Sequence, residues 1–112
     1  MKAKVLLLAL VMSFTGLLAQ NKDFSEKFLQ AFSIYEENNV YDALPLFIEL
    51  HKMDSTNANV CYPVGDCYLR GRSGKANAVR YLECAIRSVS PKYVGGDPGE
   101  KNAPVVAWKL LG

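Results

Sequence analysis

Residues 57–86 read NANVCYPVGDCYLRGRSGKANAVRYLECAI, and this stretch predicts two short helices with a tight turn between them. The apolar residues of each helix recur at helical spacing, which places them on one face. Gly65, Ala78 and Ala85 are small at the positions where the two helices would touch. A helix pair of this size cannot bury its apolar faces alone, so we expect a similar pair beside it. The two faces are Val64, Gly65 and Tyr68, then Ala78, Val79, Leu82, Ala85, Ile86 and Val89.

A similar helix pair is predicted upstream. Residues 23–26 have the form of a capping box, so we expect the first helix to begin there. This helix is expected to end at residues 36–39, where an Asn can adopt the left-handed conformation that follows a helix. The next helix is expected from residue 41 or 42 to about Met53, and Pro45 lies in its first turn if Asp42 is the cap. The apolar faces of this pair are Phe28, Ala31, Phe32 and Tyr35, then Ala43, Leu44, Phe47, Ile48 and Leu50.

The two pairs repeat at a nearly constant spacing. Ala31 and Gly65 are 34 positions apart. Three further pairs are each 35 positions apart: Ala43 and Ala78, Phe47 and Leu82, Leu50 and Ala85. A helix–turn–helix unit of about 34 residues is the signature of the tetratricopeptide repeat. The extra residue falls in the turn between the helices of the second pair, where it is easily absorbed.

A third repeat is predicted to begin near the end of the sequence. The tetratricopeptide pattern has Trp, then Leu three positions later, then Gly, and Trp108, Leu111 and Gly112 match these places. A Gly- and Pro-rich loop at 92–101 separates this repeat from the second one. Asn102 is expected to cap the new helix, with Pro104 in its first turn. Because this repeat stops in mid-helix, we expect the sequence to be the N-terminal part of a longer protein.

The predicted fold is therefore all-α, a solenoid of tandem tetratricopeptide repeats. The repeats occupy about 24–57 and 58–91, followed by the loop 92–101 and a truncated third repeat at 102–112. The residues expected to pack between helices are Ala31, Ala43, Phe47, Gly65, Tyr68, Ala78, Leu82, Ala85, Trp108, Leu111 and Gly112.

Residues 1–20 have the composition of a secretory signal peptide. Two lysines precede the apolar run 5–12, and cleavage is expected after residue 19 or 20. The alternative, a transmembrane anchor, would need about twenty apolar residues, and this run is interrupted from Ser13 onward. The sequence therefore predicts an exported protein.

The charge of residues 21–112 is balanced overall but uneven along the chain. These residues contain 11 basic and 11 acidic side chains, without the basic excess that is typical of a nucleic-acid-binding protein. Residues 21–57 have a net charge of −4 and residues 58–112 a net charge of +4. Ordinary solvated helix faces account for this asymmetry. The alternative is an acidic end and a basic end that orient a partner.

Three cysteines, Cys61, Cys67 and Cys84, are outside the signal peptide. Cys61 and Cys67 are on one helix and point in different directions, so they cannot pair. Cys67 and Cys84 are on neighbouring helices, and a disulfide between them is possible. The odd number argues against a disulfide framework, and we expect all three to be small buried hydrophobic residues.

No catalytic, metal or phosphate site is predicted. His51, the only histidine, is expected on the outer face of its helix, where a solvated role is far commoner than catalysis. No Cys/His spacing fits zinc, and the segment 71–74 is too short for a phosphate loop. We therefore expect no enzyme activity, no cofactor, no metal and no small-molecule substrate.

The first helices of stacked repeats line a concave groove. The expected groove surface is aromatic and mixed in charge, which suits a peptide or a segment of a neighbouring protein. Two alternatives remain open: Phe28 and Phe32 belong to the core, and Asp66 and Arg70 only pair with each other. The groove candidates are Phe28, Phe32 and Tyr35 in the first repeat, and Tyr62, Asp66, Leu69 and Arg70 in the second.

The sequence resembles the N-terminal repeats of envelope proteins from the Bacteroidota. The resemblance is carried by residues 43–47, 57–69, 78–86, 89–93 and 100–112. The most specific part is the long loop followed by the sequence KNAP. Pro63 departs from the pattern, and we expect it to shorten or kink the start of its helix.

In that family the repeats are typically followed by a propeller of WD-like blades and an OmpA-like domain that grips peptidoglycan. Some members resemble components of the type IX secretion and gliding apparatus. The resemblance therefore implies a periplasmic, outer-membrane-associated scaffold with protein partners, reaching peptidoglycan only through domains beyond these 112 residues. The alternative is a structural module that packs on its own downstream domains and has no external ligand.

Overall fold

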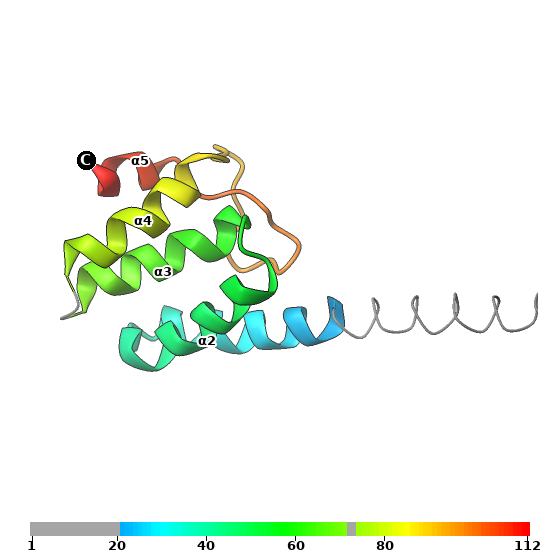
Figure 1. Ribbon diagram of the computed structural model, residues 1–112. Helices are drawn as coiled ribbons and strands as arrows, with labels where there is room; N and C mark the ends of the chain where they lie inside the picture. The colour runs from blue at the N-terminus through cyan, green and yellow to red at the C-terminus, as the bar shows by residue number, and fades with distance from the viewer. Residues whose placement is uncertain (1–20, 72–73) are drawn as a thin grey trace, which may run out of the picture.

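The computed structural model describes residues 21–71 and 74–112, which form helices joined by short turns and one long loop (Figure 1). The prediction of an all-α fold is confirmed for these residues. The expected signal peptide, residues 1–20, lies outside them. Within the described ranges, no helix is both long and apolar enough to cross a membrane.

The first hairpin consists of a helix, described from residue 21 to residue 36, and α2 (Val40–Met53). The helix is already formed at residue 21, so the expected start at 23–26 is wrong. The turn between the helices contains Asn38 with a φ of 62°, the left-handed conformation predicted for an Asn at this point.

The start of α2 differs from the prediction. Asn39 is the N-cap, and its side chain accepts a hydrogen bond from the Asp42 backbone N–H. The Asn39 amide in turn donates to the Asp42 carboxylate at 2.7 Å, so Asp42 is the third residue of the helix and completes a reciprocal cap. Pro45 consequently lies inside α2, beyond its first turn.

The second hairpin consists of α3 (Ala58–Arg70) and α4 (Lys75–Ile86). The Asn57 side chain caps α3 by accepting a 3.0 Å hydrogen bond from the Asn59 backbone N–H. The helix continues unbroken through Pro63, so the expectation of a shortened start is wrong. Gly74 precedes α4 with a φ of 82°, a conformation that favours glycine.

The end of the chain departs from two expectations. Helix α4 ends at Ile86, so Val89 is not on a helix and instead forms an isolated bridge with Ala103. The last helix, α5 (Val106–Leu111), has no side-chain cap. Asn102 is not its cap, because its side-chain oxygen accepts a hydrogen bond from the Ser88 hydroxyl. This bond and the bridge hold the two ends of the segment between α4 and α5 together.

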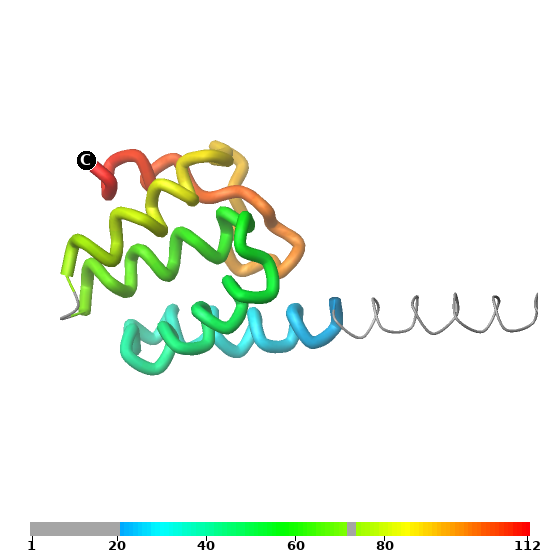
Figure 2. Tube along the Cα trace, in the orientation of Figure 1, coloured from blue at the N-terminus to red at the C-terminus, as the bar shows by residue number. Residues whose placement is uncertain are grey.

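The helices share two apolar clusters. The larger one joins the helix 21–36, α2 and α3; the smaller one joins α3, α4, Ala103 and Ala107 of α5. Figures 1 and 2 show α3 lying between α2 and α4. Gly65 allows α3 and α4 to approach closely, because a Cβ atom there would lie 2.7 Å from Leu82 Cγ. The side chains of Ala31, Ala43, Phe47, Ala78, Leu82 and Ala85 are all fully or almost fully buried.

The remaining residues expected between helices are less buried. Tyr68 is half-buried and stacks on the Tyr81 ring at 5.6 Å. Trp108 is 55% exposed, Leu111 is half-buried and Gly112 is exposed. In α5 the buried position is instead Ala107, which packs in the smaller cluster. The Trp108 ring is therefore outside the interface between α4 and α5.

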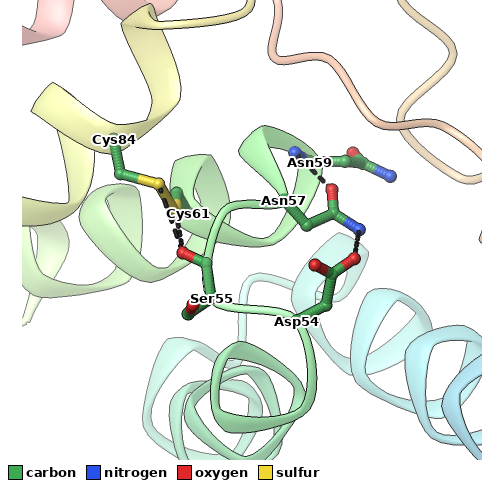
Figure 3. The surroundings of a disulfide bond; sticks show 6 residues. All are labelled: Asp54, Ser55, Asn57, Asn59, Cys61 and Cys84. Carbon is green, nitrogen blue, oxygen red and sulfur yellow. Dashed lines mark hydrogen bonds between the residues drawn. A yellow bond between two sulfur atoms is a disulfide. The ribbon is translucent and has the colours of Figure 1, made fainter.

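A disulfide between Cys61 and Cys84 connects α3 to α4, with a Cα–Cα distance of 6.0 Å (Figure 3). The expectation that all three cysteines are small buried hydrophobic residues is wrong for the bonded pair and correct for Cys67, a buried free thiol that does not form the possible disulfide with Cys84. Residues at equal distance from the turn of an antiparallel hairpin lie opposite each other, and Cys61 and Cys84 satisfy this condition. Cys67 faces the larger apolar cluster instead.

Candidate functional site

The candidate site is the face formed by the helix 21–36 and α3, and its first aromatic residue belongs to the core. Phe28 is fully buried. Its ring stacks on Phe32 at 5.9 Å and contacts Phe47 edge-on at 6.2 Å. Phe32 and Tyr35 are half-buried and continue along the same helix. The alternative of a core role is therefore correct for Phe28, whereas Phe32 and Tyr35 remain partly accessible.

A polar cluster connects the helix 21–36 with the end of α3. Arg70 forms a 3.0 Å ion pair with Asp66, as one alternative reading of the sequence expected. The same carboxylate accepts a hydrogen bond from the Tyr35 hydroxyl, and the Arg70 guanidinium lies 5.1 Å from the centroid of the Tyr35 ring. Arg70 also donates to the Asn38 side-chain oxygen at 3.2 Å. These contacts fix the position of a charged pair at one end of the face.

The phenol and thiol groups on and beneath this face are held in their protonated forms. Burial, a hydrogen bond to Asp66 and the negative charge of Asp66 raise the pKa of Tyr35 above its usual range. Burial is also the main cause that raises the pKa of Tyr62. Burial raises the pKa of the Cys67 thiol to about 12. At neutral pH these groups are therefore hydrogen-bond donors or apolar surface, and Cys67 is not an activated nucleophile.

The loop 92–101 lies against this face. The Tyr93 ring contacts the Tyr62 ring edge-on at 6.4 Å. Gly96 lies on Phe32, because a Cβ atom at Gly96 would be 3.2 Å from Phe32 Cε1. The Asn59 side-chain amide donates to the Asp97 backbone carbonyl at 3.2 Å. The loop thus contacts both helices of the candidate site.

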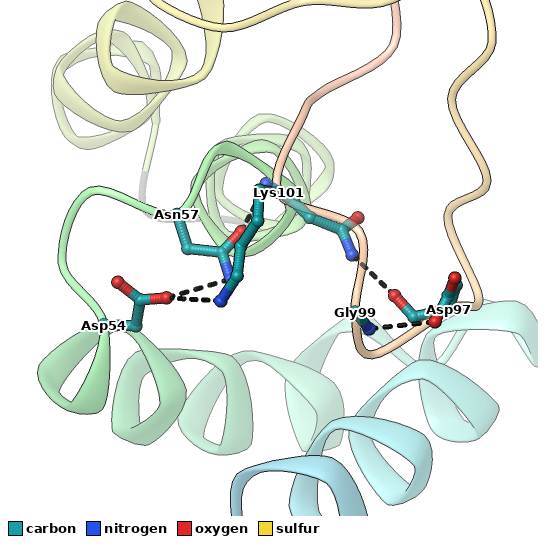
Figure 4. A network of polar contacts seen from close by, with 6 residues as sticks. Asp54, Asn57, Asp97, Gly99 and Lys101 are labelled. Atoms are coloured by element: carbon teal, nitrogen blue, oxygen red, sulfur yellow. Dashed lines mark hydrogen bonds and ion pairs between the residues drawn. The ribbon is translucent and has the colours of Figure 1, made fainter. Parts of the chain in front are cut away.

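An ion pair holds the C-terminal end of the loop at Lys101. Lys101 forms a 3.1 Å ion pair with Asp54, and its ammonium group lies 5.6 Å from the centroid of the Phe24 ring. The Asn57 amide donates to the same Asp54 oxygen at 3.2 Å. Figure 4 shows Lys101 reaching from the loop toward Asp54 at the start of the α2–α3 connection.

Leu69 is separate from the other candidates. It lines a pocket formed by α3, α4 and α5, together with Ala78, Leu82 and Leu110. Lys75 and Lys109 also line this pocket. Of the seven groove candidates, the structure therefore brings Phe32, Tyr35, Tyr62, Asp66 and Arg70 to one face, places Phe28 beneath it and places Leu69 elsewhere.

Sequence reasoning missed the residues that hold the loop: Phe24, Asp54, Asn59, Tyr93 and Lys101. Asn59 and Asp97 are 38 positions apart, and no periodic pattern connects them. Loop contacts of this kind follow from the conformation of glycine- and proline-rich backbone, which composition alone does not determine.

The part of the chain that the structure describes contains no group of three or more His, Cys, Asp or Glu side chains that could hold a metal ion. His51 is half-buried rather than fully solvated, because its ring packs edge-on against Tyr81 at 5.1 Å.

Comparisons with protein-family models, with curated proteins and with solved structures found no match.

Proposed function

We propose that this chain is a tetratricopeptide-type scaffold that binds a segment of another protein on the face formed by the helix 21–36 and α3. One observation carries the proposal. Two consecutive helix hairpins place partly accessible aromatic rings, Phe32, Tyr35 and Tyr62, beside the fixed Asp66–Arg70 pair. Rigid aromatic rings next to oriented charges are typical of surfaces that recognise peptides.

The proposed location is the periplasm, in association with the outer membrane of a bacterial envelope. The composition of residues 1–20 supports export. The disulfide between Cys61 and Cys84 supports an oxidising compartment, because disulfides rarely persist in the cytosol. We propose protein partners rather than nucleic acid, because residues 21–112 have no net basic charge.

A second candidate is a structural role, in which the chain packs on another domain and has no external ligand. The observation that favours it is the exposed apolar surface around α5. Val105, Val106 and Trp108 are 51%, 42% and 55% exposed, respectively. Apolar side chains grouped in this way are typical of a surface that another domain covers. The two candidates use different faces of the molecule, so they can be tested separately.

Selection from a displayed library of random decapeptides tests the first candidate. The dissociation constants of the selected peptides are measured for the wild type, for Tyr62→Ala/Arg70→Gln and for the matched control Tyr41→Ala/Arg87→Gln, which alters exposed residues outside the face. We expect the first double variant to bind at least about tenfold more weakly, a loss of roughly 1.4 kcal/mol. The control should bind like the wild type.

Equal binding by both double variants would contradict the assignment of this face, and failure to select any peptide would favour the structural role. Circular dichroism must show that the variants are folded, because removal of Arg70 leaves Asp66 without its ion pair.

A further inference from the structure

We infer that the loop 92–101 occupies this face as an intramolecular ligand, and that the external peptide displaces it by presenting the same chemistry. This chemistry is an aromatic side chain, a glycine or another small residue three positions later, and a cation five positions after that. The inference rests on the proposed function and deepens it, because it states which class of peptide the face accepts.

Three side-chain contacts hold the loop on the face at spaced positions. Tyr93 contacts Tyr62, Gly96 lies on Phe32, and Lys101 pairs with Asp54. The three receiving residues come from three different parts of the chain, namely the helix 21–36, the α2–α3 connection and α3. The face therefore already holds a ten-residue segment at three points, as a peptide-binding surface would.

Asn59 contacts the main chain of the loop. Its side chain is 1% exposed and donates to the Asp97 carbonyl, but its Oδ1 atom is buried and has no hydrogen-bond partner among the described residues. A carboxamide can bond both the C=O and the N–H of one residue in an extended peptide. The loop offers the Asn59 side chain only the carbonyl group of Asp97. A peptide that supplies both groups would satisfy the buried acceptor, which is costly to leave unpaired.

The loop can leave without disturbing the helices. None of the residues 92–101 is fully buried. Both ends of the loop are fixed outside the face, where the Ala103 N–H donates to the Ser88 carbonyl at 2.8 Å and the Ser90 N–H donates to the Ala103 carbonyl at 3.0 Å. Segments with few buried contacts open at low free-energy cost. The loop is thus a tethered competitor for the site.

A tethered competitor lowers the apparent affinity for any external peptide by the fraction of molecules in which the site is open. Gly96→Leu should raise that fraction, because a side chain at this position meets the Phe32 ring. Lys92→Leu adds the same side chain at an exposed position of the same loop and is the matched control.

The test uses the loop itself as the probe. The synthetic peptide KYVGGDPGEK is titrated into the wild type, Gly96→Leu and Lys92→Leu, and binding is followed by NMR chemical shifts. We expect Gly96→Leu to bind it with a dissociation constant of about 0.1 mM or lower, because an effective concentration of about 1 mM for the tethered loop must exceed this constant roughly tenfold to keep the wild-type site closed. Resonances of Phe32, Asn59 and Tyr62 should shift. The wild type and Lys92→Leu should bind at least about tenfold more weakly, and the peptide KYVGLDPGEK should not bind.

Tyr93→Ala, which removes the ring contact with Tyr62, provides a second displaced variant if Gly96→Leu does not fold. The inference is overturned if the peptide binds neither displaced variant, or if it binds them and the wild type equally. In either case, peptides selected from the random library that still bind the face would leave the proposed function intact. Absence of binding by both kinds of peptide would remove the inference and the proposed function together.

Discussion

At the scale of single residues, the close approach of α3 and α4 depends on a glycine facing a leucine. A Cβ atom at Gly65 would lie 2.7 Å and 2.8 Å from Leu82 Cγ and Cδ2, respectively. The side chain of Leu82 is 1% exposed, so it has little room to move away. Position 65 therefore tolerates no side chain without a shift of Leu82 or of the helices.

A double-mutant cycle tests this contact. Leu82→Ala should lower the free energy of unfolding by about 2–5 kcal/mol, because it leaves a cavity. In Gly65→Ala, overpacking should lower the free energy of unfolding by about 1–3 kcal/mol. The better helix propensity of alanine should offset about 1 kcal/mol of this loss. The loss in the double variant should be smaller than the sum of the two single losses by at least about 1 kcal/mol, because the new methyl group fills part of the cavity.

Urea unfolding measures the free energy of unfolding of all four proteins, and Leu29→Ala, at an exposed position, is the control. Additive losses would contradict the packing described for Gly65 and Leu82.

The Tyr35 hydroxyl predicts a dependence of stability on pH. The folded state raises the pKa of Tyr35 through burial and its interactions with Asp66. Folding therefore favours the protonated phenol, so this contribution is complete below the unfolded pKa of about 10 and is lost as the pH rises above it. Tyr35→Phe should be less stable by about 1 kcal/mol at pH 7, and its stability should fall less steeply between about pH 10 and 11. Urea midpoints across this range measure the difference.

Tyr41→Phe is the matched control, because Tyr41 is 64% exposed. It should keep the pH dependence of the wild type. If Tyr35→Phe and the wild type have parallel stability curves above about pH 10, the Tyr35–Asp66 interaction does not stabilise the folded state as described.

At the scale of elements, hydrophobic periodicity was sufficient to find the helices but not their ends. Asn39 and Asp42 are both good capping residues, and the sequence alone does not decide which one begins the helix. In the structure they bond each other, so both residues serve the same cap. Val89 has helical spacing to Ala85, yet it pairs with Ala103. That partner lies across a loop that no local pattern predicts.

The disulfide was missed although the sequence contains a usable signal. Cys61 and Cys84 are equally far from the turn between α3 and α4, so an antiparallel hairpin places them side by side. An odd number of cysteines argues against a disulfide framework, but it does not exclude a single pair. The loop contacts had no comparable signal, because they depend on glycine- and proline-rich backbone and on one amide, Asn59.

The disulfide should hold the second hairpin together. Its ends are separated by 23 positions, and closing a loop of this length stabilises the folded state by about 3 kcal/mol in the chain-entropy model. Reduction should therefore lower the thermal midpoint, whereas Cys61→Ala/Cys84→Ala should be insensitive to reductant. Thermal unfolding followed by circular dichroism measures both proteins.

Mass spectrometry checks the pairing. Alkylation of the denatured, unreduced protein should label Cys67 alone. Labelling of all three cysteines, or an unchanged midpoint after reduction, would contradict the account of the disulfide.

At the scale of the whole molecule, the part of the chain with the first hairpin and the part with the second differ in charge. Residues 21–57 carry a net charge of −4 and residues 58–112 a net charge of +4. The loop 92–101 crosses this division, because Lys101 in the basic half pairs with Asp54 in the acidic half. A peptide that replaces the loop would therefore meet an acidic end of the site near Asp54, and electrostatic attraction of its cation should accelerate association at low salt.

Asp54→Asn tests this orientation. A selected peptide that carries a cation should bind Asp54→Asn more weakly and with a smaller dependence on salt, since the charge it meets is removed. Glu83→Gln, which removes a carboxylate at an exposed position of α4, is the matched control. Association rates at two salt concentrations, measured by surface plasmon resonance, distinguish the two variants. Equal salt dependence in both would show that Asp54 does not receive the peptide's cation.

Amide hydrogen exchange in the presence and absence of a selected peptide shows whether the peptide takes the place of the loop 92–101. We expect the peptide to slow exchange in the helix 21–36 and α3 and to accelerate exchange at Val94 and Gly99, whose amides form hydrogen bonds within the bound loop. Protection confined to the surface around Trp108, with the loop amides unchanged, would contradict this expectation.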